Sequence, residues 1–143
     1  MSNFKIGAEE SNYLSVTIDG RPDERDDWLS RTISIRAGAF SATLDATLLT
    51  CDFPRFRTQL ESLYKTLSGD ATFETIEDQL GFRLTGNERG GISVDGTVLD
   101  RVGDGNQLNF RFDIDQTYLR QIIRDVQIIE TEFPNKIHPS YPQ

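Results

Sequence analysis

The sequence predicts an α+β domain in which an antiparallel β-sheet of about seven or eight strands has two α-helices packed on it. Three observations lead to this prediction. Eight segments alternate apolar and polar residues with a period of two, two longer segments have the helical period, and turn-rich stretches separate most of the strands. At 143 residues the chain is expected to form a single domain over residues 1–134, followed by a flexible tail over residues 135–143.

Four strands are expected before the first helix. Their ranges are 4–7, 12–19, 31–38 and 40–48. In the second of them Leu14, Val16 and Ile18 alternate with polar residues, so these three side chains should face the core. In the fourth the apolar positions begin at Phe40, and Gly38 marks the bend that precedes it.

The first helix is expected from Phe53, where the period of the apolar residues changes from two to that of an amphipathic helix. The apolar stripe consists of Phe53, Phe56, Leu60, Leu63, Tyr64 and Leu67. Either Thr50 or Asp52 can serve as the N-cap, and Gly69 should stop the helix.

Four further strands and a second helix are expected in the remainder of the chain. The strand ranges are 70–76, 79–86, 91–99 and 107–114. Asp115 is then positioned to cap a helix that runs to about Glu132 and ends before Pro134.

The charge of the chain favours a basic protein partner over nucleic acid. Lys and Arg number 15 against 23 Asp and Glu, which gives a net charge of −8, whereas phosphate contacts need clustered cations. Residues 19–27 contain five acids and two arginines, and residues 70–78 contain four acids and no base. These segments form either one acidic patch that steers a basic partner or two separate solvated edges.

The chain has the features of a cytoplasmic protein. Its single cysteine, Cys51, excludes an internal disulfide. The N-terminal residues have neither a basic region nor an apolar region of a signal peptide, and no apolar run is long enough to span a membrane.

The sequence lacks a recognisable catalytic, metal-binding or cofactor-binding constellation. Its one histidine, His138, lies in the proline-bounded tail, and Cys51 has no matching histidine in an ordered segment. Metal-ligand motifs such as CxxC and the calcium-loop spacing are absent. A non-enzymatic binding protein is therefore favoured. A small hydrolase that uses two carboxylates, such as Asp26 and Asp27, and an intracellular adaptor remain the alternatives.

Two acidic segments supply the candidate partner-binding residues. The first is the acidic loop, residues 21–27, and the Trp28 that follows it. Trp28 is expected either to fold back into the core and fix the loop or to anchor an interface. The candidates of the first segment are Asp23, Glu24, Asp26, Asp27 and Trp28, and those of the second are Asp70, Glu74, Glu77 and Asp78.

The order of several short motifs resembles the WapI family of bacterial immunity proteins. The motifs are "FKIG" near the start, "DDWL" at the end of the acidic loop, "AGAFSATLDATL", "FPRFRTQLESLYKTLSG", "LTG", "GDGNQLNFRFDIDQTYLRQII" and a closing "FP". The resemblance runs from about Phe4 to Pro134. It is most specific in the long block that leads into the second helix.

The resemblance implies a small cytoplasmic protein that binds the toxic C-terminal domain of a large secreted polymorphic toxin. Such a protein blocks the active site or the substrate-binding surface of its toxin and performs no chemistry of its own. The toxin is expected to be a nuclease, because the founding toxin cuts transfer RNA. A nuclease needs a basic surface to hold RNA, which suits an acidic inhibitor.

Overall fold

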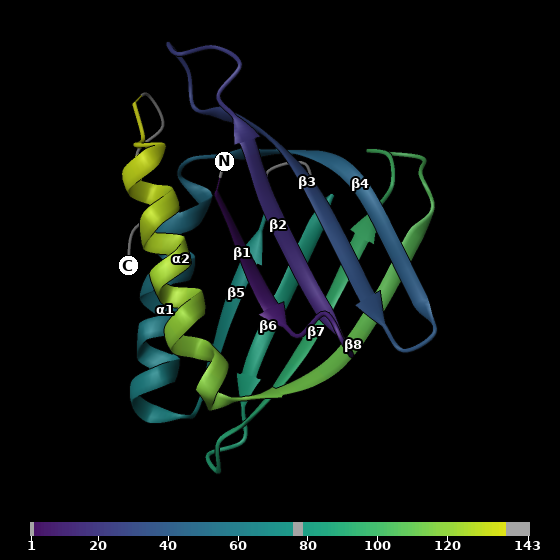
Figure 1. Ribbon diagram of the computed structural model, residues 1–143, viewed down its shortest axis with the longest axis vertical. Helices are drawn as coiled ribbons and strands as arrows, with labels where there is room; N and C mark the ends of the chain where they lie inside the picture. The colour runs from purple at the N-terminus through teal and green to yellow at the C-terminus, as the bar shows by residue number, and fades with distance from the viewer. Residues whose placement is uncertain (1, 76–78, 137–143) are drawn as a thin grey trace.

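The computed structural model describes residues 2–75 and 79–136. The chain forms eight antiparallel strands in two four-stranded sheets, and each strand pairs with the strand that follows it within its sheet (Figure 1). Sheet A consists of β1 (Ser2–Gly7), β2 (Tyr13–Gly20), β3 (Trp28–Ala37) and β4 (Phe40–Leu49). Sheet B consists of β5 (Asp70–Glu74), β6 (Leu80–Gly86), β7 (Gly91–Leu99) and β8 (Gln107–Asp115). The predicted α+β class is confirmed.

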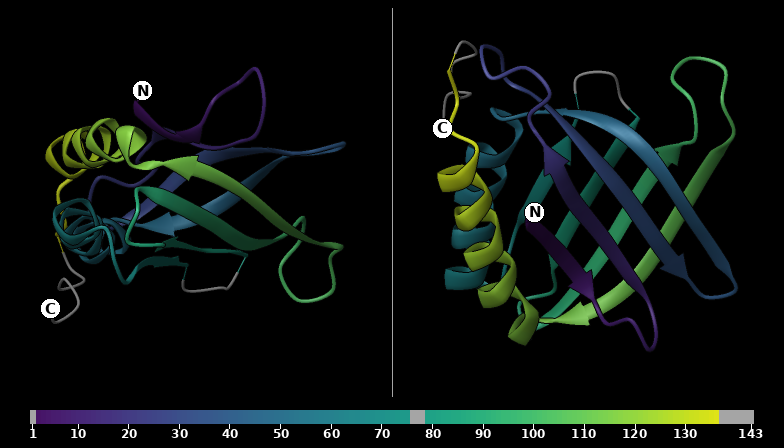
Figure 2. Two further views of the ribbon diagram at one scale, coloured as in Figure 1. Left: turned by 90° about the horizontal axis from the view of Figure 1, so that it is seen from below. Right: turned by 45° about the horizontal axis from the view of Figure 1, so that its top comes forward.

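The two sheets face each other, and both helices lie along one side of them (Figure 2). Helix α1 (Asp52–Thr66) packs beside β5, helix α2 (Leu119–Glu132) packs beside β1, and the helices contact each other. The helices therefore cover the side of the sandwich at which β1 and β5 are the edge strands. A short 3₁₀-helix, Gln116–Tyr118, leads from β8 into α2.

Both predicted helices form, but their N-caps differ in part from the predicted ones. Asp115 caps the 3₁₀-helix that leads into α2, since its carboxylate accepts a hydrogen bond of 2.8 Å from the N–H of Thr117. The N-cap of α2 itself is Tyr118, so the predicted cap of the second helix holds only for its 3₁₀ lead-in. The predicted cap of α1 by Thr50 or Asp52 is wrong, because Cys51 is the N-cap and makes no side-chain bond there. Asp52 instead accepts the N–H of Leu49 at 2.8 Å. Helix α1 ends where Leu67 adopts a left-handed conformation.

Five phenylalanine rings form the centre of the core. They come from β1, α1, β5 and β6, and their centroids lie 5.2–6.5 Å apart. The rings belong to Phe4, Phe53, Phe56, Phe73 and Phe82. Leu14, Val16 and Ile18 are fully buried, as the alternation in β2 predicted. The cluster joins both sheets to α1, so the three layers share one core.

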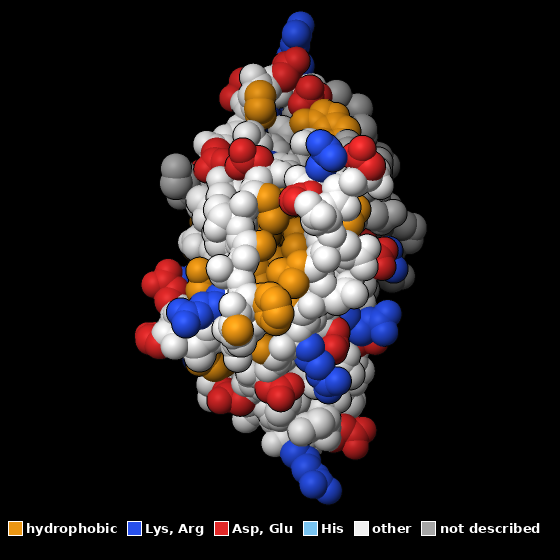
Figure 3. Space-filling view, turned by 90° about the vertical axis from the view of Figure 1, so that its right-hand side faces the viewer, with side chains coloured by type: hydrophobic (Ala, Val, Ile, Leu, Met, Phe, Trp, Pro, Cys, Tyr) orange, Lys and Arg blue, Asp and Glu red, His pale blue; other side chains and the backbone are white. Residues whose placement is uncertain are grey.

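The sandwich is more open on the side opposite the helices, where β4 and β8 are the edge strands. Hydrophobic side chains gather there in a band with charged groups around it (Figure 3). Leu44 of β4 and Leu108 of β8 are only partly buried, and Phe40 at the β3–β4 turn is 66% exposed. The apolar alternation that began at Phe40 therefore reaches the interior only from Ala46 onward.

Candidate partner-binding surface

The acidic loop joins β2 to β3 at one end of sheet A (Figure 1). Its residues alternate in charge, with four carboxylates and two arginines over residues 21–27. Ion pairs within the loop and to the C-terminal segment hold these groups in place. Three of the four carboxylates are therefore paired with a cation. The surface of the loop is therefore less acidic than a count of its carboxylates indicates.

Asp27, one of the candidate partner-binding residues, is fully buried and is therefore not available for direct contact with a partner. Its carboxylate accepts a hydrogen bond of 2.6 Å from the N–H of Lys136 and lies 4.0 Å from the guanidinium of Arg21. Its carbonyl oxygen accepts the N–H of Thr50 at 3.0 Å. A buried carboxylate needs such partners. Asp27 therefore fastens the loop to the β4–α1 connection and to the segment after α2, and it contributes to any interface only by positioning the loop.

The C-terminal segment is held against the loop up to the last described residue. Asn135 accepts a hydrogen bond of 2.8 Å from the hydroxyl of Thr50, and the ammonium of Lys136 donates one of 2.6 Å to the carbonyl of Glu24. These two residues begin the predicted flexible tail. His138 and the rest of residues 137–143 lie outside the described residues.

Asp26 shapes the turn that leads into β3. Its carboxylate accepts the N–H of Trp28 at 3.0 Å, a local bond of the type that fixes Asx turns. Its carbonyl oxygen accepts a hydrogen bond of 3.2 Å from Arg21. Asp26 is partly buried, so it supports the loop and presents only part of its side chain to solvent.

Asp23 and Glu24 are the acids that the loop presents to solvent. The carboxylate of Asp23 accepts hydrogen bonds from the backbone and the guanidinium of Arg25, which lowers the pKa of Asp23. The side chain of Glu24 is 84% exposed and lies 3.9 Å from the ammonium of Lys136, while that of Arg25 is 91% exposed. The tip of the loop therefore offers groups of both signs.

Trp28 is the first residue of β3 and is partly buried. Successive side chains of a strand point to opposite faces, and its neighbour Leu29 lies in the core. The indole of Trp28 is therefore on the outer side of sheet A. It does not fill the space between the two sheets, which differs from the expectation that Trp28 folds back into the core. A cavity of about 400 Å³ lies at the base of the acidic loop and is lined by Trp28 together with Asp19, Pro22, Arg31 and Asp45.

Arg31, which borders this cavity, is the residue that sequence reasoning missed. It is only 2% exposed and lies on the same side of β3 as Leu29 and Ile33. Arg31 alternates in step with Ile33 and Ile35, which are buried as well, so the inward position of Arg31 follows from the sequence pattern. Burial lowers the pKa of Arg31 to about 10 against the opposing effect of Asp45 and Asp19, and the guanidinium stays charged at neutral pH.

The second acidic segment lies on the other sheet. Asp70 and Glu74 are exposed residues of β5, whereas Glu77 and Asp78 lie outside the described residues. Asp70 is 3.8 Å from the guanidinium of Arg83, which reduces its effective charge. The acidic loop belongs to sheet A and joins β2 to β3, whereas Asp70 and Glu74 belong to sheet B.

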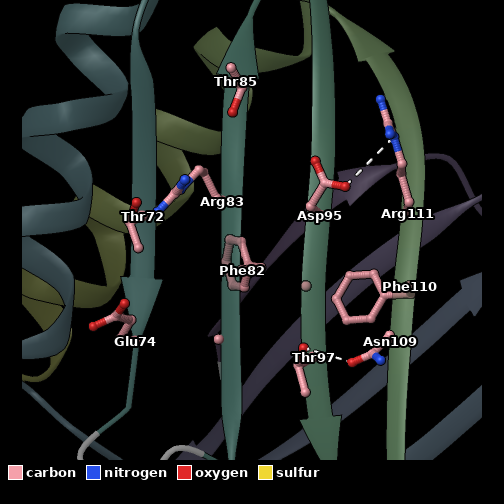
Figure 4. Close-up of a pocket in the computed structure, with 12 residues that line it drawn as sticks. Thr72, Glu74, Phe82, Arg83, Thr85, Asp95, Thr97, Asn109, Phe110 and Arg111 are labelled. Atoms are coloured by element: carbon pink, nitrogen blue, oxygen red, sulfur yellow. Dashed lines mark hydrogen bonds and ion pairs between the residues drawn. The ribbon is translucent and has the colours of Figure 1, made fainter.

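Glu74 borders a shallow hollow of about 620 Å³ on the outer face of sheet B (Figure 4). Around it, Arg111 lies 3.6 Å from Asp95, and Thr97 donates a hydrogen bond of 2.9 Å to Asn109. These groups partner one another across neighbouring strands, as is usual on the solvated face of an antiparallel sheet. The rim of the hollow is therefore polar, and the rings of Phe82 and Phe110 add an apolar part to its lining.

The described residues hold no group of three or more His, Cys, Asp and Glu side chains arranged to bind a metal ion. Within the same residues, neither helix has the length and apolar character needed to cross a bilayer. The chemistry that the sequence left open at Asp26 and Asp27 also finds little support, because one of these carboxylates is buried and both are engaged in holding the loop.

Cys51 is buried, and burial together with the neighbouring Asp52 raises the pKa of its thiol to about 11. An increase of about two in the pKa of a thiol lowers the fraction of reactive thiolate at pH 8 by roughly 100-fold. We expect iodoacetamide to modify Cys51 at least that much more slowly in the folded protein than in urea. Mass spectrometry of timed samples measures both rates, and equal rates would contradict the burial of this thiol.

Comparison with protein families assigns the chain. The model of the Immunity protein WapI-like family matches residues 5–134, which is nearly the whole chain. The chain belongs to this family. The WapI-like assignment confirms the resemblance seen in the motifs, and it indicates toxin immunity, the binding of a cognate toxin and a non-catalytic role. A search of curated proteins gives no match.

Proposed function

We propose that the chain is an immunity protein that binds the C-terminal domain of a cognate secreted polymorphic toxin in the cytoplasm and neutralises it by occlusion. The observation that carries the proposal is the match of the WapI-like family over residues 5–134. The partner we propose is a basic domain, of the kind expected for a nuclease, because the chain has a net charge of −8. No reaction by this chain is required.

Within this proposal the acidic loop, with Trp28 beside it, forms the main part of the interface. The loop stands at one end of the sandwich and is fixed from inside by Asp27, so it is presented to a partner with little loss of conformational freedom. The half-buried indole of Trp28 provides an aromatic group next to polar ones, a combination that is common where binding energy is concentrated. Asp70 and Glu74 are proposed as secondary contacts.

Co-expression with the toxin domain tests the proposal. The C-terminal domain of the large toxin encoded next to this chain is induced in cells with and without the chain, and the two proteins are then applied together to a sizing column. We expect survival of the cells and a joint elution peak. Death at the same rate in both cultures, with separate elution, would exclude an immunity function against that toxin.

Charge reversal at the tip of the loop is expected to slow association. The double variant Asp23→Lys, Glu24→Lys removes the two solvent-facing acids without touching the buried Asp27. Rim charges act mainly on the association rate, so we expect a decrease on the order of tenfold at low salt and a smaller one at high salt. Stopped-flow mixing with the toxin domain measures this rate.

The matched control is the double variant Glu9→Lys, Glu10→Lys. It makes the same change of charge in the β1–β2 turn, at the opposite end of β2 from the acidic loop. We expect the control to alter the rate much less. If both double variants slow association equally, the net charge of the chain steers the partner and the acidic loop has no special part in it.

A further inference from the structure

Arg31 is a buried cation with unused hydrogen-bonding capacity. One terminal nitrogen, Nη1, donates to the carbonyl of Leu29 at 3.2 Å. The other two nitrogens, Nε and Nη2, are buried, and within the described part of the chain neither has a hydrogen-bond partner. An unsatisfied polar group in the interior is costly, and more so when it is charged.

Asp19 and Asp45 line the same cavity as Arg31, but within the described part of the chain neither carboxylate is hydrogen-bonded to Nε or Nη2. Asp19 and Asp45 both accept hydrogen bonds from the hydroxyl of Thr32, at 3.3 and 3.4 Å. Thr32 follows Arg31 directly in β3, so its side chain points to the opposite face of the sheet. The two carboxylates therefore act on Arg31 only through space.

The two unused nitrogens are the pair that binds a carboxylate side-on. Arg57 of α1 shows the arrangement within this protein, because its Nε and Nη2 hold the two oxygens of Glu130 at 2.5 and 3.3 Å. A planar guanidinium matches the two oxygens of one carboxylate in this way. Arg31 offers the same pair, and it borders the cavity of about 400 Å³ at the base of the acidic loop.

We propose that Arg31 is a binding residue for one carboxylate group, which enters the cavity at the base of the acidic loop and bridges Nε and Nη2. The group comes either from a small free carboxylate or from an acidic side chain of the bound partner, and the second source rests on the proposed function. Nε and Nη2 are closed to solvent in the free protein, so the wall of the cavity has to part before the carboxylate reaches them.

Two signals report on the site directly. The Nε–H of Arg31 gives a cross-peak in ¹⁵N–¹H spectra, and Trp28 is the only tryptophan, so its fluorescence reports on the same cavity. Sodium acetate and, as the control, sodium chloride are titrated into separate protein samples at the same ionic strength. A saturable shift of the Arg31 cross-peak with acetate and none with chloride supports a free carboxylate as the ligand. The same shift with both salts overturns the proposal.

Three variants make the test specific. Arg31→Met removes the guanidinium, Arg31→Lys keeps the charge but cannot bridge two oxygens, and Arg36→Met is the matched control at an exposed position of the same strand. We expect the fluorescence response to acetate to disappear in both Arg31 variants and to persist in the control. A response that survives Arg31→Lys overturns the side-on geometry.

The second source is tested with the purified toxin domain. If the partner supplies the carboxylate, complex formation shifts the Arg31 cross-peak, and Arg31→Met weakens binding by about 10-fold to 100-fold while Arg36→Met has little effect. If wild-type and Arg31→Met proteins bind the toxin domain equally and acetate has no effect, this proposal is wrong and the immunity function stands. If no complex forms with the wild-type chain, the immunity function against that toxin fails, and the acetate titration alone decides the role of Arg31.

Discussion

The variant Phe73→Ala is expected to lower the free energy of unfolding by about 3–5 kcal/mol, the range typical of a fully buried phenylalanine that is cut back to alanine. Phe73 is 1% exposed, and its ring contacts four others at centroid distances of 5.2–6.1 Å. These rings belong to both sheets and to α1. The loss of Phe73 therefore leaves a cavity at the point where all three layers meet.

Urea unfolding followed by circular dichroism measures this change. The control is Phe40→Ala, which removes the same side chain at a position that is 66% exposed, and we expect it to change the free energy by no more than about 0.5 kcal/mol. Similar losses at Phe40 and Phe73 would contradict the location of the core. An intermediate loss is expected for Phe73→Leu, which fills part of the cavity.

The variant Asp27→Ala is expected to destabilise the fold by about 3 kcal/mol, because the removal of one member of a buried polar group leaves its partners unsatisfied. The N–H of Lys136 loses its acceptor, and the buried guanidinium of Arg21 loses its nearest carboxylate. The acidic loop then becomes detached from the segment after α2. We also expect weaker toxin binding, because the loop has to be ordered again in the complex.

The matched control for this variant is Asp23→Ala, which removes a solvent-facing carboxylate of the same loop and should leave the unfolding midpoint unchanged. Urea unfolding measures stability, and titration calorimetry with the toxin domain measures affinity. If the two variants Asp27→Ala and Asp23→Ala have the same unfolding midpoint, Asp27 does not hold the loop.

Local patterns predicted the elements of this fold well because hairpins and amphipathic helices depend on neighbouring residues. The alternation of Leu14, Val16 and Ile18 and the stripe from Phe53 to Leu63 correspond to buried faces. The division into two sheets depends on long-range pairing. Nothing in the alternation of β4 and β5 shows that α1, which separates them in the chain, passes from one sheet to the other.

The candidate site was predicted less completely, for a related reason. Composition identified the acidic loop, but the partner that buries Asp27 is Lys136, which lies 109 residues later in the chain. Such a contact has no local signature. Arg31 is different, because its inward position follows from the alternation in β3, and only the usual exposure of arginine argued against it.

Hydrogen exchange of the chain, alone and with the toxin domain, tests the central claim most directly. The measurement compares amide protection in the two samples by mass spectrometry. Binding through the acidic loop predicts slower exchange over residues 20–28 in the complex and little change in the β1–β2 turn at the opposite end of β2. Identical exchange in the two samples, or protection only in the β1–β2 turn, would contradict the claim that the acidic loop binds the toxin domain.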